Sequence, residues 1–62
     1  MKTNMITVFM KNGPKHIFRG VIEFEVIADD SKVEFLYIRN IDNVEYFIPF
    51  DITRGYLEKE EK

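Results

Sequence analysis

The sequence predicts an all-β fold, a strongly bent antiparallel sheet of five short strands. The first observation is the stretch HIFRGVIEFEVIA at residues 16–28, where apolar side chains alternate. Alternation indicates a strand, because successive side chains of a strand point to opposite faces. The second observation is Gly20 inside this long stretch, which predicts a bend that lets one strand serve two parts of the sheet. The third is Asn12-Gly13 just before it, a pair typical of tight hairpin turns.

Four further segments complete the predicted sheet. They alternate in the same way and are separated by polar turns, whose residues hydrogen-bond to their own backbone. Pro49 ends the ladder of the fourth strand because it has no N–H, and residues 49–52 resemble a single helical turn. Residues 1–4 and 59–62 are expected to fray. The predicted strands are residues 5–11, 33–39, 44–50 and 53–58, with polar turns at residues 29–32 and 40–43.

A competing prediction is an α+β fold in which the C-terminal part is helical from Ile52 onward. Three residues of that segment argue against it. Thr53 and Tyr56 favour strands, and Gly55 weakens a helix. The all-β fold is therefore preferred.

The length and composition indicate one small domain over residues 1–62. The chain has 45% hydrophobic and 15% aromatic residues, which is enough apolar material for a core. A domain of this size buries only about 60% of its unfolded surface and is marginally stable alone. The absence of cysteine excludes disulfides and thiolate metal sites.

Charge and hydropathy restrict the kinds of molecule that the chain is expected to bind. The net charge of −2 gives no global basic field for nucleic acid or an anionic membrane. No apolar run approaches the ~18 residues of a membrane span. The first residues lack the apolar core and cleavage site of a signal peptide, so we expect no membrane association and a cytoplasmic location.

The inventory of reactive side chains predicts no enzyme, no cofactor and no metal site. The hydroxyl nucleophiles are Ser31 and a few threonines, and His16 is the one histidine. Glu23 and Glu25 share a face and could serve acid–base chemistry, but carboxylates that alternate with apolar residues more often form a solvent-exposed face. The three glycines are isolated, so no loop could cradle a phosphate.

Apolar residues occur on both faces of several predicted strands. One interpretation is the ordinary exposure of apolar atoms on a small β protein. The other is a contiguous patch that forms an interface. Strands with apolar residues on both faces, in a short chain without disulfides, also predict self-association. The simplest form is a symmetric homodimer that pairs through edge strand one or edge strand five.

The segment ITVFMKNGPKHIFRGVIEFEV, residues 6–26, resembles the opening of Sm-like barrels. It shares a strand, an Asn-Gly turn, and a long bent strand with a glycine in its middle. This resemblance implies that the sheet rolls into an SH3- or Sm-like barrel or half-barrel. The expected strands leave no place for the N-terminal helix of that family. Residues 44–56 do not reproduce its RNA-binding motif, so no RNA-contacting residue is transferred.

Two motifs carry a second resemblance. In the closing segment FIPFDITRGYLE, residues 47–58, an Ile-Pro turn leads to a last edge strand. The opening motif comprises Val8, Phe9, Gly13, Phe18, Arg19, Gly20 and Val21. Both look like those of small β-rich proteins of phages and mobile elements of Gram-positive bacteria. The resemblance implies a viral accessory protein that binds and blocks a host or defence protein in the host cytoplasm, with no active site.

The favoured hypothesis is thus a non-enzymatic protein-binding factor. We expect its binding site on the outer face of the bent strand, at Ile17, Arg19 and Val21, with Phe9 beside it across the hairpin. Aromatic residues and arginine are enriched where binding energy concentrates.

The alternative hypothesis is a small barrel that binds single-stranded nucleic acid by stacking bases on aromatic side chains beside cationic residues. Its candidate contacts are Lys11, Lys15 and Arg19. Acidic residues are interleaved through the same strands, which makes this hypothesis the second choice.

Overall fold

The computed structural model describes residues 2–30 and 32–61, which form five antiparallel strands in one sheet. The predicted all-β fold is confirmed. The described strands at the two edges do not pair with each other, so the bent sheet stays open and is not closed into an SH3- or Sm-like barrel. The helical turn expected at residues 49–52 is present as a 3-10 helix, η1 (Phe50–Ile52).

The longest strand, β2 (Lys15–Asp29), pairs with β1 (Thr3–Met10) along its first half and with β3 (Lys32–Asn40) along its second half. β4 (Glu45–Pro49) pairs with the far side of β3, and β5 (Thr53–Glu61) pairs with the far side of β1. The strand order is therefore β4-β3-β2-β1-β5.

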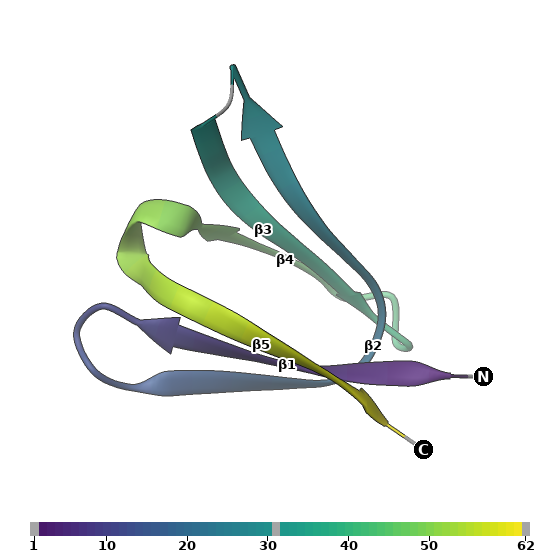
Figure 1. Ribbon diagram of the computed structural model, residues 1–62. Coiled ribbons are helices and arrows are strands. Elements are labelled where there is room, and N and C mark those ends of the chain that lie inside the picture. Colours follow the sequence, from purple (N-terminus) through teal and green to yellow (C-terminus); the bar gives the residue numbers. More distant parts are fainter. Residues whose placement is uncertain (1, 31, 62) are drawn as a thin grey trace.

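Because β2 bends, the sheet folds into two layers that face each other. The first layer contains β1, β5 and residues 15–20 of β2, and the second contains residues 22–29 of β2, β3 and β4. Figure 1 shows β2 passing from one layer to the other, with η1 connecting them again on the opposite side. The predicted role of this strand in two parts of the sheet is confirmed.

The bend is a β-bulge at Gly20, whose φ of 65° lies in the left-handed region that glycine adopts without strain. Between Phe18 and Val21, β2 advances three residues while the facing segment of β1, from Ile6 to Asn4, advances two. The extra residue changes the phase of the alternation. Phe18 and Val21 therefore point to the same side, although an uninterrupted strand would place them on opposite sides.

Two contacts fix the bulge. The Gly20 N–H donates to Glu61 Oε1 at 2.8 Å, and the Gly20 carbonyl accepts from the Ile41 N–H at 2.9 Å. The end of β5 and the β3–β4 turn thus hold the corner from two directions.

The core lies between the two layers and joins them. Two aromatic pairs cross it, and each has one ring in each layer. Phe18 contacts Tyr46 with centroids 4.9 Å apart, and Phe24 contacts Tyr56 at 5.1 Å. The fully buried side chains, with at most 1% exposure, are Ile6, Val8, Val21, Leu36 and Ile38.

Pairing between β1 and β5 extends to residues near both ends that were expected to fray. Thr3 and Asn4 belong to β1, and residues 59–61 belong to β5, where Thr3 pairs with Glu61; residues 1 and 62 lie outside the described part. The prediction that strand one is an edge is wrong, since β1 lies between β2 and β5.

Candidate functional site

Three of the four predicted protein-binding residues share one face of the sheet. Phe9 lies opposite Lys15, and Ile17 lies opposite Thr7, so these side chains project from the first layer away from the core. Arg19 continues the same face of β2. Val21 does not belong to this site. It is 1% exposed in the core, because the bulge at Gly20 reverses the side to which it points.

The structure adds a residue that the sequence hypothesis missed. Leu57 of β5 lies directly opposite Thr7, which completes a cross-strand row with Ile17 on the other side. Ile17 is 46% exposed and Leu57 is 61% exposed, while Thr7 between them is buried. We call Thr7, Phe9, Ile17 and Leu57 the apolar patch. Leu57 follows another apolar residue, Tyr56, so alternation alone does not indicate which of the two points outward. The β1–β5 pairing places Leu57 beside Thr7.

Cationic side chains border the apolar patch. The Arg54 guanidinium lies over the Phe9 ring, 6.0 Å from its centroid. Lys15 is opposite Phe9 on β2, and Lys59 is opposite Met5 on β5. Arg19 is partly neutralised, because its Nη1 lies 3.7 Å from Glu61 Oε2. Of the residues expected to bind nucleic acid, Lys15 and Arg19 thus flank the patch, whereas Lys11 lies in the exposed β1–β2 turn.

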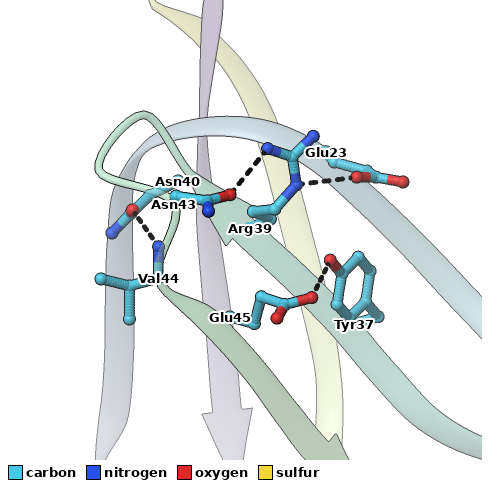
Figure 2. A network of polar contacts seen from close by, with 7 residues as sticks. All are labelled: Glu23, Tyr37, Arg39, Asn40, Asn43, Val44 and Glu45. Atoms are coloured by element: carbon cyan, nitrogen blue, oxygen red, sulfur yellow. Dashed lines mark hydrogen bonds and ion pairs between the residues drawn. The ribbon is translucent and has the colours of Figure 1, made fainter.

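The outer face of the second layer is built differently. Figure 2 shows Arg39 between two partners: its Nε donates to Glu23 at 3.0 Å, and its Nη1 donates to Asn43 at 3.2 Å. Beside them the Tyr37 hydroxyl donates to a Glu45 carboxylate oxygen at 2.6 Å. The part of this face nearest the β3–β4 turn is therefore covered by a network of polar side chains that bind one another. Farther along, Phe47 is 60% exposed and packs against Tyr37, with ring centroids 5.0 Å apart.

The β3–β4 turn beneath this network is fixed by one side chain. The Asn40 carboxamide oxygen accepts the backbone N–H groups of Asp42 and Val44 at 2.9 and 3.0 Å. Asn43 adopts a φ of 64°, which asparagine tolerates well. The sequence prediction of a turn made of residues that hydrogen-bond to local backbone is confirmed at this position.

The network shifts two ionisation equilibria. The hydrogen bond to Glu45, together with desolvation and the nearby negative charges, raises the pKa of Tyr37 above its ordinary value. The hydrogen bond to Glu23 raises the pKa of Arg39 in the same way. Both shifts stabilise the protonated forms, so neither group is prepared to act as a base or a nucleophile.

An apolar hollow of about 240 Å³ lies between the β1–β2 hairpin and the β4–η1 segment. His16 lies at this hollow among apolar side chains. Within residues 2–30 and 32–61, no three His, Cys, Asp or Glu side chains gather as metal ligands would. The lining residues are Met10, His16, Phe18, Phe47, Ile48, Pro49 and Ile52.

Two further findings concern membrane crossing and similarity to known proteins. Across the described part of the chain, no helix has the length and apolarity that a membrane crossing requires. Comparison with protein-family models, curated proteins and solved structures finds no match to this chain.

Proposed function

We propose that this protein is a non-enzymatic accessory or inhibitory factor that binds another protein through the apolar patch. The observation that carries the proposal is the row formed by Ile17, Thr7 and Leu57, whose two outer members are 46% and 61% exposed. A contiguous apolar surface with a polar border is typical of protein–protein interfaces.

The border defines the chemistry of the partner. Lys15, Arg54 and Lys59 place positive charge around the patch, although the chain as a whole carries a net charge of −2. A complementary partner presents apolar side chains bordered by carboxylates. Complementary charge at an interface border increases specificity and the association rate.

The proposed setting follows the resemblance to phage and mobile-element proteins. In that setting the chain acts in the cytoplasm of a Gram-positive host, and its target is a host or defence protein. This step rests on analogy of sequence pattern alone.

A matched pair of substitutions tests the site. Leu57 in the apolar patch and Phe47 on β4 are equally exposed, at 61% and 60%, so Leu57→Ser and Phe47→Ser remove comparable apolar surface. A partner is first enriched from Gram-positive lysate with the tagged native chain, then purified and titrated. We expect Leu57→Ser and Ile17→Ser each to weaken binding at least about tenfold, a loss of ~1.4 kcal/mol, while Phe47→Ser binds normally. Enrichment of no partner by the native chain, or equal loss in Phe47→Ser, contradicts the proposal.

The second candidate function is binding of single-stranded nucleic acid. Lys15 and Arg19 flank the patch, and Lys11 lies in the adjoining turn, so cations and Phe9 share one side of the hairpin. Fluorescence anisotropy with single-stranded DNA and RNA at physiological salt distinguishes the two candidates. Binding tighter than about 1 μM, lost in Lys11→Ala and Lys15→Ala, favours nucleic acid, because non-specific binding is weaker than this.

A further inference from the structure

The edges of an open sheet are where another chain can add a strand, and the two described edges of this sheet are unequal. β4 has five residues and ends at Pro49, which has no N–H to donate. β5 has nine residues, and among the described strands it pairs with β1 alone. β5 therefore offers the longer edge for backbone hydrogen bonds.

The sequence of β5 is polarised in charge. Arg54 lies at its beginning, and Glu58, Lys59, Glu60 and Glu61 give its end a net negative charge. Charged residues usually protect an edge strand from pairing. When two copies of β5 run antiparallel, however, the basic beginning of each strand meets the acidic end of the other.

The register of such a pair is restricted. A shift of one residue would place the outer face of one copy beside the inner face of the other. A symmetric register centred on Leu57, the middle residue of β5, overlaps the whole strand. Arg54, an extra residue between the paired Thr53 and Gly55, lies on the outer face over Phe9, and this register places it beside Glu61 of the second copy on the same face. No two like charges are directly opposite. The neighbouring symmetric register centred on Glu58 would oppose two carboxylates, which is unfavourable.

We propose that two copies of this chain form a symmetric dimer by antiparallel pairing of their β5 edges, with Leu57 opposite Leu57. The row formed by Ile17, Thr7 and Leu57 then continues without interruption into the same row of the second copy. The two apolar patches become one surface. The dimer can be tested separately from the proposed function, because Ile17→Ser alters the apolar patch and leaves the β5 edge intact.

Cross-linking tests the register directly, because the chain has no cysteine of its own. We expect Leu57→Cys to form a disulfide-linked dimer under mild oxidation, since directly opposite Cα atoms in antiparallel strands lie ~4.5–5.5 Å apart and disulfides span ~4.4–6.8 Å. Phe47→Cys, equally exposed on β4, is the matched control and should stay monomeric on a non-reducing gel. More efficient cross-linking by Tyr56→Cys or Phe47→Cys than by Leu57→Cys overturns the proposed register and edge.

Charge reversal tests, without a cross-link, whether the basic beginning of β5 pairs with the acidic end of β5 in the other copy. Sedimentation equilibrium of the native chain should give a mass about twice the 7.4 kDa of the monomer. Arg54→Glu should weaken the dimer, because it places a second carboxylate beside Glu61 of the other copy. Lys11→Glu makes the same change of charge in the exposed β1–β2 turn and is the control that should leave the mass unchanged. A monomer at micromolar concentration, or a larger assembly built by β4–β5 pairing, overturns the proposal.

Discussion

The two layers of this sheet share a core but differ in how their outer side chains are paired. On the second layer, Arg39 and Tyr37 find their hydrogen-bond partners within the chain. On the first layer, Ile17 and Leu57 project from either side of Thr7, and nothing in the described part of the chain covers them. Polar side chains of the second layer are thus already hydrogen-bonded, and its exposed Phe47 packs against Tyr37, with ring centroids 5.0 Å apart. Ile17 and Leu57 of the first layer remain available for a partner.

The largest expected effect comes from the core that joins the layers. Ile38→Ala removes a fully buried side chain of the second layer, and such truncations lower the free energy of unfolding by about 2–5 kcal/mol. Since small domains have a total of only ~5–15 kcal/mol, urea unfolding followed by circular dichroism should show a largely destabilised protein. The control Phe47→Ala removes an exposed ring that packs against Tyr37, so it should lower the free energy of unfolding by at most about 1.5 kcal/mol. A change of at most ~0.5 kcal/mol for Ile38→Ala would mean that the layers are stabilised separately.

A smaller loss of unfolding free energy is expected at Gly20, where β2 bends from one layer to the other. Gly20→Ala places a Cβ at a φ of 65°, which costs about 1–2 kcal/mol of unfolding free energy. Crowding adds little, because the nearest atom to that Cβ, Ile41 Cγ1, is 3.5 Å away. Gly20→Asn should cost less than Gly20→Ala in the same denaturation experiment, since asparagine tolerates this conformation. Equal losses in the two variants would locate the cost in side-chain packing and not in the backbone.

The smallest effect concerns the polar network of the second layer. The hydrogen bond to Glu45 raises the pKa of Tyr37 in the folded protein. Because the folded pKa lies above the unfolded one, this contribution to stability is complete below the unfolded pKa and is lost as pH rises through the folded pKa. Glu45→Gln should lower the pKa of Tyr37, as measured by the difference in ultraviolet titration between each background and its Tyr37→Phe variant. An unchanged pKa would show that the hydrogen bond is absent in solution.

Local sequence signals predicted most of the strands and turns, because they depend on neighbouring residues. The alternation across residues 16–28, Asn12-Gly13 and the turn at Asn40 all describe what the backbone does nearby. The location of the bend at Gly20 was also predictable. That bend moves Val21 into the core, however, because the inserted residue reverses the side to which Val21 points. A second register shift, between Val21 and Glu23, returns Phe24 to the core side, and the alternation of the sequence indicates neither shift.

The candidate site was less predictable because it depends on pairing between distant segments. Phe9 and Ile17 belong to a local hairpin, so their common face could be inferred from sequence. Leu57 joins them only through the register of β5 on β1, in which Thr7 meets a residue from the other end of the chain. Alternation shows which residues of β5 share a face, but not which residues of β1 they meet.

The interior position of β1 also has a consequence for how the chain folds during synthesis. Of the five described strands, β1 emerges from the ribosome first, and the strand that covers its outer edge, β5, emerges after the other four. Contacts between such distant segments form slowly, and an unpaired strand edge promotes aggregation in the meantime. The nascent β1–β2 hairpin must therefore remain soluble with one edge of β1 open until β5 is available to pair with it.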